Sequence, residues 1–200
     1  MESRPAAPSV EELFESAGAL RHGHFRLKSG LHADRYLEKF AVLQFPSVAS
    51  DLCARLAAAL ADEAPDVVVG PTTGGVLLAF ETARHLEAIL GRPVRGLFAE
   101  PVTDGGRELR RGFRIDPGER VVIVDDILTT GGSLRETLDA VRVAGAEPRA
   151  AAVLVDRSDG GVEVGVPLRA LARIEIPAWP ADACPRCAEG VPLEIPGSSA

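Results

Sequence analysis

Residues 121–134 read VVIVDDILTTGGSL and carry the most specific pattern in the chain. Its branched apolar residues predict a strand over 120–124, buried on both faces as in a parallel sheet. Two aspartates, Asp125 and Asp126, follow at the carboxyl end of that strand. Because ligands of open parallel sheets bind beyond the carboxyl ends of the strands, the two acids are expected at the ligand edge.

The turn after the aspartates has the composition of an anion-binding turn, and it consists of Thr129, Thr130, Gly131, Gly132 and Ser133. A helix is predicted over 134–144, with Ser133 as its N-cap and Glu136 as the partner in a capping box. Glycines let the backbone approach a ligand, and amides at a helix N-terminus favour negative charge. The turn is therefore predicted to hold a phosphate monoester.

The two aspartates need a different part of the same ligand, since carboxylates repel a phosphate. Hydroxyl groups or a divalent cation would suit them, and a ribose 5-phosphate offers a diol a few ångströms from its phosphate. An isolated Asp-Asp pair more often only solvates the end of a sheet, but the complete string of strand, acids, turn and helix favours the ligand. The sequence contains neither GxxxxGK[ST] nor GxGxxG after a strand, which disfavours a P-loop and a dinucleotide fold.

Strands and helices alternate from about residue 47 to 156, which predicts an α/β fold with an open, mostly parallel sheet flanked by helices. One domain is expected over 1–200, with its core at about 47–160. The segments 9–45 and 161–200 are expected to form a small hood lobe. Residues 100–112 are polar and glycine-containing, which predicts a long mobile loop or a hairpin.

Composition limits the possible partners. The 200 residues carry a net charge of −7, so a broad basic surface for nucleic acid is not expected. No apolar run reaches the roughly 18–20 residues of a membrane helix, and the first residues lack a signal-peptide core, so a cytoplasmic protein without membrane contact is expected. Three cysteines do not indicate a secreted disulfide framework.

VVIVDDILTTGGSL resembles the phosphoribosyl-pyrophosphate (PRPP) motif of the type I phosphoribosyltransferases. The resemblance implies the fold of that family. It also implies that Asp125 and Asp126 hold the ribose 2- and 3-hydroxyls, and that Thr129 to Ser133 bind the 5-phosphate.

Three further segments resemble the orotate phosphoribosyltransferases in particular. FRLKSGLHADRYLEKF (25–40) matches their amino-terminal segment, which implies that Lys28 reaches the base and the phosphates. VVVGPTTGG (67–75) resembles the family's pyrophosphate loop, whose turn here is Thr72, Thr73, Gly74 and Gly75. Arg157 follows a strand predicted over 149–155. The resemblance implies that it faces the carboxylate of the base, which the planar guanidinium can bind through two hydrogen bonds.

The chain departs from the family pattern at two places. Many orotate enzymes carry lysines and a histidine in a mobile loop, whereas FAEPVTDGGRELRRG offers only the arginines Arg107, Arg110 and Arg111. Gly74 stands where many relatives have a lysine. We expect the three arginines to stabilise the leaving pyrophosphate after the loop closes.

The resemblance implies transfer of ribose 5-phosphate from PRPP to orotate in pyrimidine biosynthesis. Mg²⁺ is expected, held mainly by the substrate rather than by protein ligands, and a homodimer is implied. Two alternatives stay open at this point. One is a phosphoribosyltransferase for another base, purine or pathway-specific. The other is a non-catalytic PRPP sensor on the same fold.

The tail CPRCAEGVPLEIPGS (184–198) also resembles one bacterial branch of these enzymes. Cys184 and Cys187 supply only two thiolates, and the sequence near them contains no second pair and no histidine. A structural zinc site is therefore not favoured. The four histidines are expected to be structural or exposed, because none stands in a ligand pattern; they are His22, His24, His32 and His85.

Overall fold

The computed structural model describes residues 7–27, 29–158 and 160–196. The chain divides into two compact units. The small unit combines the residues up to Val42 with those from Ile174 onward, and the large unit spans Leu43–Arg173. Among the described residues, no helix has the length and apolar character needed to cross a membrane.

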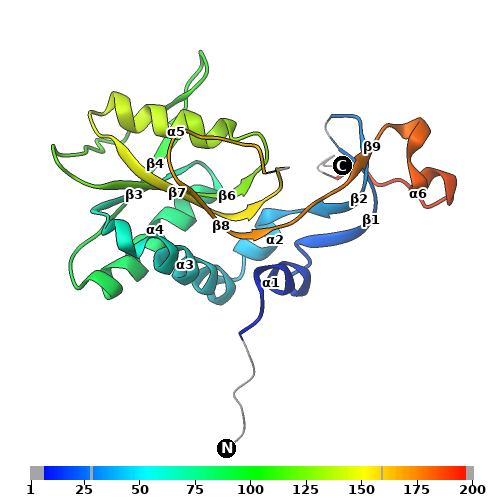
Figure 1. Cartoon of the computed structure of the whole chain (residues 1–200), viewed down its shortest axis with the longest axis horizontal. Helices are drawn as coiled ribbons and strands as arrows, with labels where there is room; N and C mark the ends of the chain where they lie inside the picture. Colours follow the sequence, from blue (N-terminus) through cyan, green and yellow to red (C-terminus); the bar gives the residue numbers. More distant parts are fainter. Residues whose placement is uncertain (1–6, 28, 159, 197–200) are drawn as a thin grey trace, which may run out of the picture. The chain divides into compact units, whose positions relative to one another are not determined.

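A sheet forms the centre of the large unit (Figure 1). Its six strands have the order β5-β4-β3-β6-β7-β8. Five strands run parallel and the edge strand β5 pairs antiparallel with β4, so the predicted mostly parallel sheet is confirmed. The strands are β3 (Val67–Pro71), β4 (Arg95–Pro101), β5 (Arg107–Leu109), β6 (Val121–Leu128), β7 (Pro148–Asp156) and β8 (Leu168–Arg173).

Helices cover both faces of this sheet (Figure 1). They are α3 (Pro46–Leu60), α4 (Gly74–Leu90) and α5 (Gly132–Val143), with the 3-10 turn η1 (Ala61–Glu63) after α3. Helices α3 and α4 lie together on one face and α5 lies on the other. Alternate strand residues such as Val67, Val69 and Ile123 pack with Leu134 and Leu138 of α5 in one fully buried cluster. The continuous apolar runs of β3 and β6 follow from this two-sided cover.

The register of the central strands aligns their ends. Val67 pairs with Val121 and Val69 with Ile123 in parallel, so β3 and β6 deliver their following residues to the same edge. Strand β6 continues to Leu128 rather than ending at 124, because the long strand β7 offers pairing partners as far as Asp156. The two aspartates consequently belong to the strand itself.

Helix α5 begins differently from the prediction. Its N-cap is Gly131, in the left-handed region with φ +79°, and Ser133 already lies inside the helix. The predicted capping box of Ser133 and Glu136 is therefore wrong. The hydroxyl of Ser133 donates to Asp125 instead, and Glu136 forms an ion pair with Arg107, so both side chains have tertiary partners in place of the helix start.

The small unit contains an antiparallel sheet of three strands, with the order β1-β2-β9. Phe14 and Phe25 are fully buried within this unit. Its elements are α1 (Val10–Ser16), β1 (Leu20–Arg26), β2 (His32–Leu37), β9 (Ala178–Trp179), η2 (Ala181–Ala183) and α6 (Pro185–Ala188); α2 (Lys39–Leu43) lies at the junction of the units in sequence.

The boundary between the units lies later in the chain than the predicted end of the core near residue 160. Strand β8 pairs with β7 over Ala151↔Leu168 to Asp156↔Arg173, so this segment completes the large sheet. The proline-rich composition after residue 156 does not indicate a strand here. Strand β8 forms because β7 supplies its hydrogen-bond partners.

Candidate functional site

Two glycine-rich turns meet at the carboxyl edge of the large sheet. One turn leads from β3 into α4 and the other from β6 into α5. A Cβ atom on Gly74 would lie only 2.2 Å from Oδ2 of Asp126, so the backbone of the first turn touches the second aspartate. The structure thus brings together the acids and both turns that the sequence singles out.

The aspartates are buried and oriented by short hydrogen bonds. Asp125 and Asp126 are only 4% and 3% exposed. Asp125 Oδ1 accepts from the backbone N–H of Asp126 at 2.8 Å, and its Oδ2 accepts from the hydroxyl of Ser133 at 2.6 Å. Asp126 Oδ1 accepts from the backbone N–H of Ile127, also at 2.8 Å. The acids are held as preorganised acceptors rather than as solvated surface charges.

In the turn over 129–133, the two threonines are exposed while the first glycine is packed. Thr129 and Thr130 are exposed, whereas Gly131 is buried and has a positive φ. A Cβ atom on Gly131 would approach Val162 to 2.9 Å. Only glycine satisfies both the backbone conformation and the packing here, and the turn is left open for an anion at the start of α5.

Arg135 holds this turn, and nothing in the sequence pattern predicts this role. Its guanidinium donates to the carbonyl oxygen of Thr130 at 2.8 Å and to that of Glu163 at 2.8 Å. The turn is thereby tied to the segment before β8. An exposed arginine in the first turn of a helix carries no sequence signal of such a contact.

The turn over 72–75 is folded tightly on itself. A Cβ atom on Gly70 would lie 2.2 Å from the carbonyl oxygen of Gly75. The backbone N–H of Thr72 donates to the carbonyl oxygen of Ala99 at 3.1 Å, and the Thr72–Thr73 peptide bond is cis. Thr73 is the N-cap of α4, which begins at Gly74.

Residues 100–112 form the predicted hairpin, and Arg107 packs against the turn over 72–75. Its Nη1 donates to the carbonyl oxygens of Ala99 and Thr72 at 3.2 and 3.4 Å. Its Nε lies 3.3 Å from Glu136 Oε2 on α5, and its side chain is only 13% exposed. Arg107 thus connects the hairpin, the first turn and the helix that follows the second turn.

Arg110 and Arg111 lie on the exposed part of the hairpin. Arg111 forms a two-pronged pair with Glu100 at 3.0 and 2.8 Å, and its guanidinium lowers the pKa of that carboxyl. Arg110 pairs with Glu108 at 3.1 Å. In this conformation both cations are neutralised by neighbours on the same hairpin, so they would have to exchange partners to meet an anionic ligand.

Of the two residues expected at the base, Arg157 and Lys28, the structure describes only Arg157. Arg157 follows β7 and is half-buried, and its backbone N–H donates to the carbonyl oxygen of Leu128 at 2.8 Å. This bond fixes the residue next to the end of β6. Lys28 lies outside the described residues.

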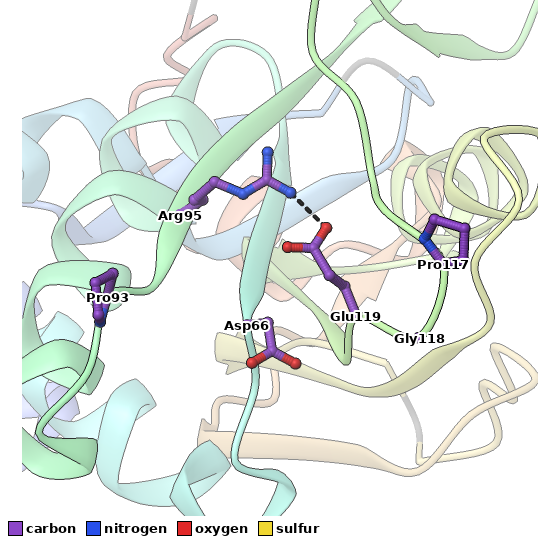
Figure 2. Close-up of a pocket in the computed structure, with 6 residues that line it drawn as sticks. All are labelled: Asp66, Pro93, Arg95, Pro117, Gly118 and Glu119. Carbon is purple, nitrogen blue, oxygen red and sulfur yellow. Dashed lines mark hydrogen bonds and ion pairs between the residues drawn. The ribbon is translucent and has the colours of Figure 1, made fainter.

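A depression of about 470 Å³ lies at the opposite, amino-terminal edge of the sheet. Figure 2 shows its lining, with Arg95 and Glu119 joined by an ion pair and Asp66 beside them. A hydrogen bond from Arg120 holds the pKa of Asp66 well below its usual range. Because parallel sheets present ligands at the carboxyl edge, these ion pairs are interpreted as structural.

Two of the four histidines belong to a group of side chains that the sequence pattern does not predict. His24 and His32 lie beside Cys184 and Cys187, and one ligand atom from each of the four residues falls within 4.8 Å of all the others. His22 and His85 instead lie near the carboxylates of Glu15 and Glu81.

The chain matches the family described as "Phosphoribosyl transferase domain" over residues 47–183. The orotate phosphoribosyltransferase of Pelotomaculum thermopropionicum is 47% identical over 94% of this chain and 96% of that protein. The orotate phosphoribosyltransferase of Caulobacter vibrioides is 46% identical over 94% of this chain and 95% of its own length.

Solved structures agree with these relatives. The orotate phosphoribosyltransferase of Mycobacterium tuberculosis, in complex with 5-phospho-α-D-ribosyl 1-diphosphate, superimposes with a TM-score of 0.63 at 25% identity. The alignment covers 83% of this chain and 96% of that chain.

Proposed function

The chain belongs to the orotate phosphoribosyltransferases, within the wider phosphoribosyltransferase family, and on this premise we propose which residues carry the reaction. The protein is an enzyme that transfers ribose 5-phosphate from PRPP to orotate, giving orotidine 5′-phosphate and pyrophosphate in pyrimidine biosynthesis. The relatives' activity favours this reaction over the two alternatives, transfer to another base and a non-catalytic sensor.

One observation carries the assignment of roles: the turn over 72–75 touches Asp126, which lies on the strand that leads into the turn over 129–133. PRPP carries a phosphate on carbon 5 of its ribose and a pyrophosphate on the anomeric carbon. Two anion-binding turns with a pair of acids between them match that order of groups. We assign the 5-phosphate to Thr129–Ser133 and the pyrophosphate to Thr72–Gly75.

We assign the ribose diol to the acids. Hydroxyl groups donate to carboxylates, and Asp125 and Asp126 are already oriented by the N–H and O–H groups that bond to them. During the reaction, the bond from the anomeric carbon to pyrophosphate breaks and a bond from a ring nitrogen of orotate forms, while that nitrogen loses its proton. Positive charge that develops on the ribose is stabilised by the two nearby carboxylates.

Magnesium fits the oxygen chemistry of this edge, since carboxylates and phosphates are the ligands that Mg²⁺ prefers. Because the two acids are assigned to the ribose diol, we propose that the cation is held mainly by the oxygens of the substrate. When bound, Mg²⁺ supplies positive charge to the leaving pyrophosphate.

The hairpin arginines are assigned to the leaving group. Arg107 lies against the turn over 72–75 and would add charge there without a large movement. Arg110 and Arg111 would contribute after closure of the hairpin, when water is excluded and charges interact more strongly. The carboxylate of orotate is assigned to Arg157, and the role of Lys28 stays a prediction from the resemblance.

We extend the proposal to a homodimer in the cytoplasm. Leu77 and Phe80 lie about one turn apart on α4 and are 51% and 69% exposed, although both are large and apolar. An apolar patch beside the turn over 72–75 supports a second copy of the chain as its cover.

The assignment of the base is tested by Arg157→Ala in a spectrophotometric orotate-consumption assay with PRPP and Mg²⁺. We expect the KM for orotate to rise roughly 10- to 100-fold through the loss of charge-assisted hydrogen bonds, while the dissociation constant of PRPP stays near the wild-type value. Arg149→Ala, an exposed arginine on the same strand, is the matched control and should change neither constant. An equal loss of orotate and PRPP binding would contradict the role of Arg157.

A further inference from the structure

Four side chains that the reaction does not use converge in the small unit; they are His24, His32, Cys184 and Cys187. The first three are only 2%, 5% and 3% exposed, and Cys187 closes the group on the solvent side. We call these four residues the Cys2His2 cluster. Two of them come from the β1–β2 hairpin and two from the tail of the chain, more than 150 residues later.

The spacing of the ligand atoms matches a tetrahedral metal site. His24 Nε2 lies 2.9 Å from His32 Nδ1, 3.5 Å from Cys184 Sγ and 3.6 Å from Cys187 Sγ, and the distance from Cys187 Sγ to His32 Nδ1 is 3.3 Å. Bond lengths to zinc of about 2.0–2.1 Å for nitrogen and 2.3 Å for sulfur give tetrahedral edges of about 3.3 Å for N···N and about 3.6 Å for N···S. Small adjustments would therefore centre an ion among the four atoms.

The backbone around the cluster holds the four ligands in place. Cys184 is the N-cap of α6 and Cys187 lies one helical turn later, so both thiols project from a single short helix. His24 lies where the β1–β2 register is irregular, and His32 begins β2 directly after the connecting loop. The tail is tied to the hairpin on both sides of α6, through β9 before it and through Glu194, which exchanges backbone hydrogen bonds with His24 and Arg26, after it.

An outer hydrogen bond sets the state of one histidine. His24 Nδ1 lies 2.8 Å from the carbonyl oxygen of Val191, which can only accept, so this ring nitrogen carries the proton. In the neutral ring, Nε2 then turns its lone pair toward His32 and the two thiols. Metal-bound histidines show this arrangement, in which the second nitrogen donates to a backbone carbonyl.

We propose that the Cys2His2 cluster is a structural zinc site. Two thiolates and two imidazoles in a tetrahedral arrangement are the donor set of structural zinc and neutralise its charge. Four protein ligands fill the coordination sphere, so the site leaves no position for water or substrate and is separate from the magnesium of the reaction. Zinc would fasten the tail to the β1–β2 hairpin.

The proposal is tested on the full-length protein, expressed with zinc in the medium and purified without chelators. We expect elemental analysis to give one zinc per chain. The variants Cys187→Ser and His32→Ala should lose this zinc. The matched controls Cys53→Ala and His22→Ala, which remove a cysteine and a histidine outside the cluster, should retain it.

Cobalt gives a second readout that does not depend on enzyme activity. Wild-type protein stripped of metal and titrated with Co²⁺ should develop the intense visible bands of tetrahedral cobalt and a thiolate-to-metal band, saturating at one equivalent. The Cys187→Ser protein should not develop these bands at one equivalent of Co²⁺. Because Cys187 is exposed, this variant is expected to fold, which circular dichroism checks independently.

Three outcomes would overturn the proposal. These are wild-type protein that binds no zinc after dialysis against Zn²⁺, zinc content that is unchanged in both cluster variants, and cobalt spectra of an octahedral site without thiolates. The first outcome, together with free thiols, would show that the cluster is only a hydrogen-bonded group.

Discussion

At position 74, glycine is required by the space that a neighbouring side chain occupies rather than by the backbone conformation. A Cβ atom at this position would meet Asp126 Oδ2 at 2.2 Å and Leu43 at 3.5 Å. From the sequence alone, glycine in place of a lysine reads as the loss of a cation near pyrophosphate. The structure adds a packing reason, because a side chain at 74 and the present position of the Asp126 carboxylate exclude each other.

The first prediction concerns Gly74→Ala. The nearest atom to the new methyl group is the end of a side chain, so we expect the fold to survive and Asp126 to be displaced. The KM for PRPP should rise roughly 10-fold or more, in proportion to a lost charge-assisted hydrogen bond, with little change in Tm. Initial rates at varied PRPP and thermal unfolding measure the two quantities.

A double-mutant cycle provides the control for Gly74→Ala. In an Asp126→Ala background the new methyl group has no carboxylate to displace, so adding Gly74→Ala should cost little more. Fully additive losses would show that position 74 acts through the backbone of the turn rather than through Asp126.

At the scale of elements, the hairpin β4–β5 gives its three arginines different surroundings. Arg107 is packed between the turn over 72–75 and Glu136 of α5, whereas Arg110 and Arg111 pair with Glu108 and Glu100 on the exposed hairpin. The sequence groups the three arginines as equivalent replacements for loop lysines. The pairing of β5 with β4 places Arg107 against the turn over 72–75. Arg110 and Arg111 could reach that turn only if the hairpin moved.

The second prediction follows from this difference. Arg107→Ala should lower kcat roughly 10- to 100-fold and also lower the unfolding free energy by about 1–2 kcal/mol, since it leaves carbonyl and carboxylate groups without their donor. Arg111→Ala should lower kcat while leaving stability within about 0.5 kcal/mol, because exposed ion pairs contribute little. Steady-state kinetics and urea unfolding of both variants test this. Wild-type kcat in both would remove the hairpin from the mechanism.

At the scale of the whole large unit, both edges of the central sheet carry acidic side chains, but their surroundings differ. The carboxyl edge combines acids with glycine-rich turns. The amino edge combines acids with arginines, where Asp66 pairs with Arg92 at 2.7 Å and with Arg120 at 2.9 Å (Figure 2 shows Asp66). Topology separates the two groups, because every parallel strand starts at one edge and ends at the other.

The third prediction is a pH dependence set by Asp66. Its pKa is lowered chiefly by the hydrogen bond from Arg120, so the folded pKa lies below the unfolded value of about 3.9. The charged carboxylate stabilises the fold above the unfolded pKa, and this contribution is lost as the pH falls through the folded pKa. Asp66→Asn should therefore lower the unfolding free energy by about 1–2 kcal/mol at neutral pH.

Urea unfolding of wild type and Asp66→Asn across the pH range measures this effect. The difference between the two proteins should shrink progressively as the pH falls below about 4, while kcat at neutral pH stays unchanged. Other carboxylates titrate equally in both proteins and cancel in the difference. A gap that does not change with pH would show that the variant acts through packing instead of charge.

Local pattern was sufficient for much of this protein. Branched apolar runs predict β3 and β6, and the glycine- and threonine-rich turns predict where each strand passes into a helix. These features depend on residues that are neighbours in the chain, so turn chemistry and strand periodicity carry them. The parallel sheet follows from the alternation of such units, and with it the shared edge at which Asp125, Asp126 and both turns lie.

Contacts between segments far apart in sequence could not be predicted, because they form only when the chain has folded. Ser133 bonds to Asp125 instead of capping α5, Arg135 holds the turn from outside it, and strand β8 depends on β7. The Cys2His2 cluster is the clearest case. CxxC near the end of the chain and two histidines near its start have no common periodicity, and they become one group of ligands only because β9 and Glu194 pair the tail with the hairpin.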